Sequence, residues 1–117
     1  MTTGRLTTHV LDTARGRPAA GVAIRLVRID GGLRAEVARA VTNADGRTDQ
    51  PLLSDPAPGV YEIEFAAGDY LRATGQAGEG LAFLDVVPIR FGIAQAGQHH
   101  HVPLLLSPFA YSTYRGS

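Results

Sequence analysis

The chain has 117 residues, of which 44% are hydrophobic, so it can bury one core but not two, and we expect a single domain over residues 1–117. Eleven basic and eleven acidic residues give a formal net charge of zero. This balance argues against nucleic acid or an anionic membrane as partner, because both need a basic surface. The sequence has no cysteine, which excludes disulfides, thiol chemistry and a zinc ion held by thiolates.

The sequence carries no visible targeting or membrane-spanning segment. The first ten residues, MTTGRLTTHV, contain no basic stretch followed by an apolar run of signal-peptide length. No segment approaches the roughly 20 consecutive apolar residues of a membrane span. We therefore expect a cytoplasmic protein whose partner is a small molecule or another protein.

Short runs of β-type residues, separated by turn residues, predict an all-β fold. The breakers RGRPAAG, DGG, NADG, SDPAPG and AQAG supply the glycine, proline, asparagine and aspartate that turns require. Helix formers between Gly68 and Gly75 predict one short helix. Some eight strands of this length favour two sheets packed as a sandwich. The expected strands are 6–13, 22–30, 33–42, a short piece at 46–48, 60–66, 84–92, 98–106 and 109–114.

Alternation within the expected strands predicts which faces are buried. Tyr61, Ile63 and Phe65 alternate with Glu62 and Glu64, which is typical of a strand with one buried and one solvated face.

The strand at 98–106 has an apolar stripe, Val102, Leu104 and Leu106, which we expect to face the core. His99 and His101 then share the opposite face, whereas His100 points away from them.

In the segment LTTHVLD, Thr7, His9 and Leu11 share one face, and Thr8 and Val10 share the other. A lone histidine on a strand is most often a surface residue. Arg47 follows the turn NADG. Such an arginine is most often a solvated charge, but its guanidinium fork could also bind a planar amide or an oxyanion.

The paired histidines leave three interpretations open. They could transfer protons, because an imidazole titrates near pH 6.5. They could bind a metal ion, although zinc needs three or four ligands and no Asp or Glu is close in sequence. They could also belong to a solvated polar turn.

The chain ends on YRGS without a polar tail. Tyr111 and Thr113 share one strand face, and Ser112 and Tyr114 share the other. Because free ends are usually frayed and polar, an end of this kind suggests a segment that is tied down.

The segments LTTHVLD, NADGRTDQPL and HHHVPLLLSP, the last followed by YSTYRGS, resemble the transthyretin-like 5-hydroxyisourate hydrolases of purine degradation. The similarity spans nearly the whole chain, and the hormone-carrying transthyretins lack YRGS. The resemblance implies a transthyretin-like two-sheet β-sandwich of eight strands or so with one short helix. It also implies a homotetramer with active sites at the dimer–dimer interface, and neither a cofactor nor a metal.

The resemblance also implies which residues form the site. The family usually has an aromatic residue where this chain has His100, and commonly a glycine where it has Ala110. The implied catalytic residues are His9, Arg47 and His101; the implied substrate-binding residues are His9, Arg47, Tyr114 and Ser117; secondary candidates are His99, Ser112, Arg115 and Gly116.

The implied reaction opens the ring of 5-hydroxyisourate by hydrolysis of an acyl carbon–nitrogen bond, giving 2-oxo-4-hydroxy-4-carboxy-5-ureidoimidazoline. His9 and His101 would position and deprotonate a water molecule, and Arg47 would stabilise negative charge on the carbonyl oxygen. A cation beside the imidazoles would also keep them neutral. Which histidine is the base stays open at this point.

Three other functions remain under consideration. The first is a transthyretin-like carrier that binds a small hydrophobic ligand without chemistry. The second is an accessory sandwich of the kind attached to some peptidases, whose pattern matches only the first half of the chain. The third is a metal-binding module built on His99 and His101.

Overall fold

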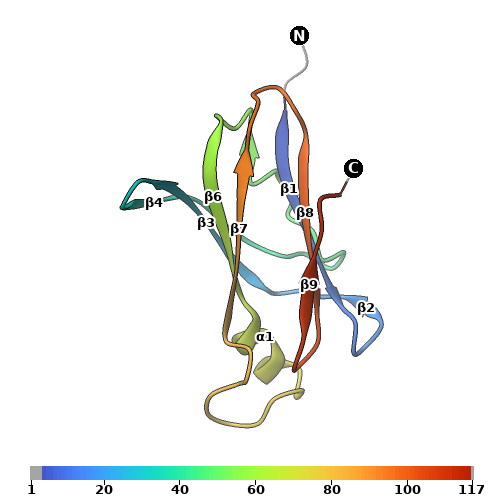
Figure 1. Ribbon diagram of the computed structural model, residues 1–117. Helices are drawn as coiled ribbons and strands as arrows, with labels where there is room; N and C mark the ends of the chain where they lie inside the picture. Colours follow the sequence, from blue (N-terminus) through green and yellow to red (C-terminus); the bar gives the residue numbers. More distant parts are fainter. Residues whose placement is uncertain (1–3, 117) are drawn as a thin grey trace.

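The computed structural model describes residues 4–116, which form nine strands and one helix (Figure 1). The helix α1 is Ala67–Ala73. The strands are β1 Arg5–Asp12, β2 Arg17–Pro18, β3 Ala23–Asp30, β4 Leu33–Val41, β5 Leu53–Ser54, β6 Gly59–Ala66, β7 Val86–Ile93, β8 His100–Leu106 and β9 Tyr111–Thr113.

The strands form two sheets. One has the order β2-β1-β8-β9, with β5 also paired to β1, and the other has the order β4-β3-β6-β7. Neighbouring strands are antiparallel except β1 and β8, which are parallel, so the first strand of the chain lies beside the eighth. Their register places Thr7 opposite His101 and His9 opposite Pro103.

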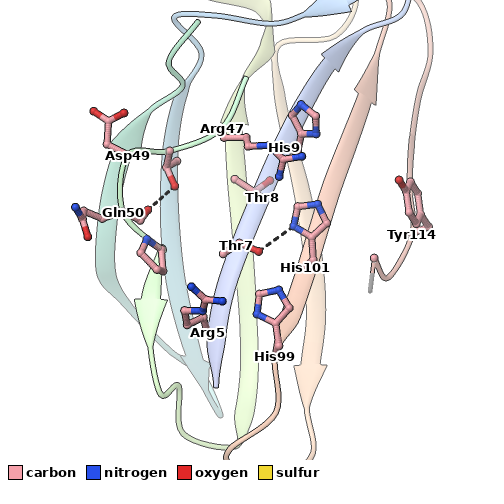
Figure 2. A pocket seen from close by; sticks show the side chains of 13 residues that line it. Arg5, Thr7, Thr8, His9, Arg47, Asp49, Gln50, His99, His101 and Tyr114 are labelled. Carbon is pink, nitrogen blue, oxygen red and sulfur yellow. Dashed lines mark hydrogen bonds between the residues drawn. The ribbon is translucent and has the colours of Figure 1, made fainter. Parts of the chain in front are cut away.

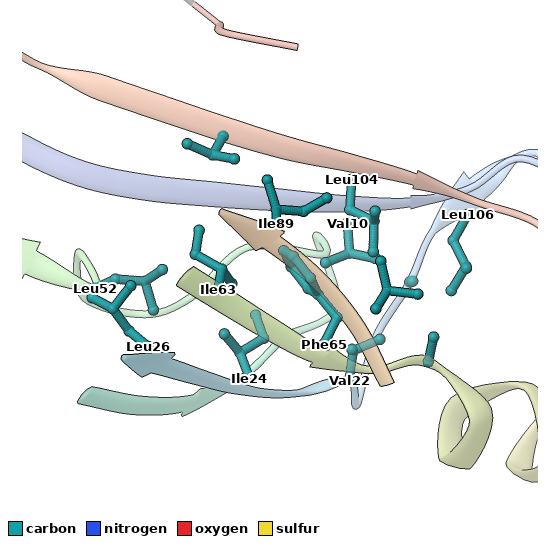
Figure 3. Packing of buried hydrophobic residues seen from close by; sticks show 14 of the residues in the cluster. Val10, Val22, Ile24, Leu26, Leu52, Ile63, Phe65, Ile89, Leu104 and Leu106 are labelled. Atoms are coloured by element: carbon teal, nitrogen blue, oxygen red, sulfur yellow. The ribbon is translucent and has the colours of Figure 1, made fainter. Parts of the chain in front are cut away.

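The core lies between the two sheets (Figure 3). Val10 and Leu104 enter it from one sheet, and Leu26, Ile63 and Phe65 enter it from the other. Each large apolar side chain buried in this way stabilises the fold by roughly 1.5–3 kcal/mol. The faces that alternation predicts for β6 and β8 as the apolar ones are buried. This architecture confirms the predicted two-sheet β-sandwich.

Three local predictions need correction. The expected strand at 46–48 is an isolated bridge between His9 and Arg47. Two strands were not predicted: β2 lies inside the expected turn RGRPAAG, and β5 follows the loop after Arg47. A two-residue strand is too short for alternation to show. The helix was predicted, and it lies one or two residues before the expected position.

Glu62 is the clearest exception to the predicted burial, since it is only 7% exposed on the face expected to be solvated. Its carboxylate accepts hydrogen bonds from Arg34 at 2.6 Å and from Arg90 at 3.2 Å. Arg90 stands directly opposite Glu62 in the β6–β7 pair. A carboxylate can therefore be buried here because cross-strand arginines compensate its charge.

Helix α1 is attached to the end of β1 through Asp12, which is buried. The hydroxyl of Tyr70 donates to Oδ2 of Asp12 at 2.6 Å, Nε2 of Gln76 donates to the same oxygen at 2.9 Å, and the Arg15 amide donates to Oδ1 at 2.9 Å. Burial alone would raise the pKa of Asp12, but these three bonds outweigh it and lower the pKa. The hydrogen bonds therefore hold the carboxylate ionised.

Within residues 4–116, α1 is too short to cross a bilayer, and no longer apolar helix occurs there.

Candidate active site

A polar cavity of about 560 Å³ opens on the face of β1 and β8 that points away from the core. Residues at alternate positions of the two strands reach it, because successive side chains of a strand point to opposite faces. The loop after Arg47 forms one wall (Figure 2). The lining residues are Arg5, Thr7, Thr8, His9, Arg47, Thr48, Asp49, Gln50, Pro51, His99, His101, Tyr114 and Gly116.

The turn NADG places Arg47 beside His9. The side-chain oxygen of Asn43 accepts hydrogen bonds from the amides of Asp45, at 2.9 Å, and of Arg47, at 3.2 Å. Gly46 has φ +74°, a conformation that glycine adopts without a steric penalty. A Cβ at this position would also collide with the Val10 carbonyl. The tight turn thus lets the chain form the bridge between Arg47 and His9.

His9 is held with one ring nitrogen unpaired. Its Nε2 is the one buried side-chain nitrogen or oxygen within residues 4–116 that has no hydrogen-bond partner. Burial, followed by the positive charge of Arg47, lowers the pKa of His9, and Asp45 opposes this in part.

His101 shares the cavity with His9 and Arg47. Its Nδ1 lies 2.9 Å from Oγ1 of Thr7. Burial lowers the pKa of His101, and the charge of Arg47 and then the two neighbouring histidines, His9 and His99, lower it further. A pKa below the ordinary value of 6.5 means that both imidazoles are neutral at pH 7.

The three side chains point toward one another from β1, β8 and the loop that follows the NADG turn (Figure 2). A neutral imidazole can accept a proton from water near pH 7. A guanidinium in the same cavity can stabilise an oxyanion. This arrangement has the groups needed for hydrolysis of an acyl carbon–nitrogen bond.

Four other expected residues are also at this cavity or near it. Tyr114, Gly116 and His99 line it. Nη2 of Arg115 points back to the His99 carbonyl, at 3.5 Å, and Arg115 lines a separate, smaller cavity.

The two serines expected at the site, Ser112 and Ser117, are not among the residues that line the cavity within 4–116. Ser112 lies on β9 opposite Leu105 and does not line the cavity. Ser117 lies outside the described residues. His100 points away from His101 and is buried, as alternation predicts.

The sequence did not single out several lining residues, among them Arg5, Thr7, Asp49 and Gln50. Thr7 and Arg5 share the strand face of His9, so alternation places them on the cavity side of β1. Asp49 and Gln50 lie in an irregular loop, for which alternation gives no guide. Within residues 4–116, no three His, Asp or Glu side chains gather closely enough to hold a metal ion.

The fold and the cavity together define the class of this protein: a two-sheet β-sandwich that carries neutral imidazoles and a guanidinium in one polar cavity. The chain belongs to the HIUase/Transthyretin family, whose model matches residues 6–116. The predicted family resemblance is therefore confirmed.

Three known proteins show the range of this similarity. The chain is 60% identical to the 5-hydroxyisourate hydrolase of Mesorhizobium japonicum, over 97% of this chain and 93% of the relative. A structure of (S)-allantoin synthase has a TM-score of 0.91 and 44% identity over 99% of this chain, which spans only 44% of that longer protein. Sea bream transthyretin in complex with thyroxine has a TM-score of 0.86 and 29% identity, over 96% of this chain and 94% of that one.

Proposed function

We propose that this protein is a 5-hydroxyisourate hydrolase. The observation that carries the proposal is the meeting of His9, His101 and Arg47 in one cavity, with both imidazole pKa values lowered. The identity to the Mesorhizobium japonicum enzyme, which bears this name, supports the same activity. The reaction belongs to purine catabolism.

In the proposed mechanism, His9 and His101 bind the attacking water and one of them removes its proton. The water oxygen then bonds to the acyl carbon, and Arg47 stabilises the negative charge that develops on the carbonyl oxygen. As the carbon–nitrogen bond breaks, the protonated imidazole gives its proton to the leaving nitrogen. Every proton is therefore accounted for within the side chains and the water, and the step requires no cofactor.

Tyr114 and Ser117 complete the proposed substrate pocket. Tyr114 lines the cavity from the segment that follows β9, at the side opposite the loop wall (Figure 2). Its phenol ring and hydroxyl suit a flat, polar, heterocyclic substrate, because the ring offers a face and the hydroxyl a hydrogen bond. We assign Ser117 a substrate-binding role as well.

The second candidate is a carrier of a small hydrophobic ligand, which the likeness to sea bream transthyretin in complex with thyroxine favours. The cavity here is lined mainly by arginine, histidine, threonine, aspartate and glutamine. A site for a hydrophobic ligand is usually lined by apolar side chains. The polar lining therefore supports the hydrolase over the carrier.

We further propose a homotetramer with its active sites at the dimer–dimer interface. Strand β9 forms one edge of its sheet, and all three of its residues are exposed. The first of these residues is Tyr111, and Phe109 and Tyr114 beside the strand are exposed as well, so a second copy would cover these aromatic surfaces. Sedimentation analysis tests this: a monomer at micromolar concentration would contradict the proposal.

The activity is tested by following the ultraviolet absorbance of freshly generated 5-hydroxyisourate with and without the protein. The expected result is decay much faster than the spontaneous reaction, and a slower decay with the His101→Asn variant. If the wild-type protein does not accelerate the decay, the hydrolase proposal is wrong and the carrier is favoured.

A further inference from the structure

The imidazole of His101 is held on one side by a threonine from the neighbouring strand. Thr7 stands directly opposite His101 in the parallel β1–β8 register. Its hydroxyl oxygen lies 2.9 Å from Nδ1 of the ring, in a partly buried setting. The two residues are 94 positions apart in sequence, so only the parallel pairing of the first and eighth strands brings them together.

The other side of the same ring is covered by the backbone of Gly116. The amide of Gly116 donates to the His101 carbonyl at 2.8 Å. A Cβ on Gly116 would collide with Cδ2 of the imidazole and would lie within 3.2 Å of its Cγ and Cβ. A glycine is therefore needed for the C-terminal segment to pack this closely on the ring.

His9 has no such support from its cross-strand neighbour. The residue opposite it is Pro103, which offers neither a side-chain hydrogen-bonding group nor an amide hydrogen. The backbone and the charge of Asp45 act on His9 instead, and both raise its pKa. Of these two histidines, only His101 therefore has a cross-strand hydrogen bond to its ring, and Thr7 provides it.

The contact with Thr7 is compatible with both neutral forms of the His101 ring, because a hydroxyl can accept from an Nδ1–H or donate to a bare Nδ1. In the first form, the proton is on Nδ1 and Nε2 carries a lone pair. In the second form, the Thr7 hydroxyl donates to Nδ1 and the proton is on Nε2. Only the first form can accept a proton from water on Nε2, so a base that acts through this nitrogen requires it.

We propose that Thr7 is a positioning residue that, together with Gly116, fixes the ring of His101 with its proton on Nδ1 and the lone pair of Nε2 free toward the cavity. His101 then accepts the proton of the attacking water on Nε2, while Nδ1 keeps its bond to Thr7 before and after the transfer. This inference rests on the proposed hydrolase function and adds to it the residue that orients the base.

The test uses the full-length protein and three substitutions of Thr7. Thr7→Val removes the hydroxyl with almost no change in volume, Thr7→Ser keeps the hydroxyl, and Thr7→Ala serves if the valine variant does not fold. Thr13→Val is the matched control. The hydroxyl of Thr13, the residue after β1, also forms a hydrogen bond with β8, but it donates to the Leu106 carbonyl, at 3.0 Å, at the other end of that strand from His101. Gly116→Ala tests the other side of the ring.

Two measurements are made on each variant. Nitrogen-15 NMR of the histidine rings reports which nitrogen of His101 carries the proton. We expect one Nδ1–H form in the wild type, Thr7→Ser and Thr13→Val, and a mixture of both forms in Thr7→Val or Thr7→Ala. Steady-state kinetics should show kcat falling by up to about 100-fold in Thr7→Val and Gly116→Ala, with KM little changed, and recovery of most of the loss in Thr7→Ser.

The two proposals fail in different ways. If the wild type and Thr7→Val have the same His101 ring form, or if Thr7→Ser is as impaired as Thr7→Val, the role of Thr7 is wrong even when the enzyme is active. If the wild-type protein does not hydrolyse 5-hydroxyisourate but its NMR spectra change as expected, the orientation by Thr7 stands and the hydrolase function is wrong.

Discussion

Polar side chains on the two faces of strand β1 differ in their hydrogen bonding. Asp12, on the inward face, has two side-chain donors and one backbone donor on its carboxylate. His9, three residues earlier on the outward face, has a buried Nε2 with no partner within residues 4–116. Both groups are shielded from water, but only the Asp12 carboxylate has hydrogen-bond partners for its buried atoms.

The difference separates a structural polar group from a functional one. A buried polar group without a hydrogen-bond partner costs about 1–3 kcal/mol of folding free energy. Stability alone would therefore favour a partner for this nitrogen or an apolar side chain in its place. At Asp12 the hydrogen bonds overcome the effect of burial and keep the carboxylate charged. At His9 burial and Arg47 act together and keep the imidazole neutral. The first arrangement fixes α1 against β1, and the second leaves Nε2 of His9 open to a ligand.

The largest expected effect comes from removing the imidazoles. His9→Asn and His101→Asn should each lower turnover by roughly 10²- to 10⁴-fold, because a general base contributes that much to a rate. Both residues point away from the core, so the free energy of unfolding should change little. Stopped-flow assays of freshly generated substrate measure the first quantity, and urea denaturation measures the second. Wild-type turnover in both variants would contradict the assignment.

A smaller effect, on stability instead of activity, is expected at the inward face. Tyr70→Phe removes the 2.6 Å hydrogen bond to Asp12 and should lower the free energy of unfolding by about 1–3 kcal/mol. Turnover at 25 °C should be unchanged, since Tyr70 does not line the cavity. Urea denaturation at pH 7 measures the loss.

Tyr111→Phe is the matched control, because Tyr111 is exposed in the single chain and the change keeps the aromatic ring that a second copy would cover. An exposed substitution of this kind should change stability by no more than about 0.5 kcal/mol. If Tyr70→Phe lost activity while keeping its stability, the division between the two faces of β1 would be wrong.

The sequence predicts the strand faces well because alternation repeats over seven or eight residues. It places Ile63 and Leu104 inward and His101 outward, and the structure agrees. It does not show that β1 and β8 are parallel neighbours, because the alternation within a strand does not identify the strand with which it pairs. The contact between Thr7 and His101 depends on that register, so it became visible only in the structure.

The site residues came from the family resemblance, and periodicity did not identify them. Taken alone, Arg47 is a charge after a turn. Its position beside His9 depends on the hydrogen bonds of Asn43 and on the close approach of Gly46 to Val10. The burial of Glu62 was missed for a related reason: the two arginines that compensate its charge lie on other strands.

The smallest expected effect concerns the pH at which the two histidines titrate. The positive charge of Arg47 disfavours each imidazolium, so Arg47→Gln should raise the pKa of both His9 and His101. Both should stay below 6.5, because burial is the larger cause of the shift. NMR titration of the ring protons measures the two values without relying on activity. Arg115→Gln is the control, since Arg115 does not contribute to either shift.

The same shifts have a consequence for stability with a defined sign. Between the folded pKa and 6.5, the unfolded chain binds more protons at these two residues than the folded chain does, so their contribution to stability rises with pH in that window. Stability is therefore lost as the pH falls from 6.5 toward the folded values. Arg47→Gln brings the folded pKa values closer to 6.5 and narrows the window, so urea denaturation from pH 7 to pH 5 should show a shallower loss at these sites than in the wild type. An equal or steeper loss would mean that Arg47 does not act on the imidazoles by charge.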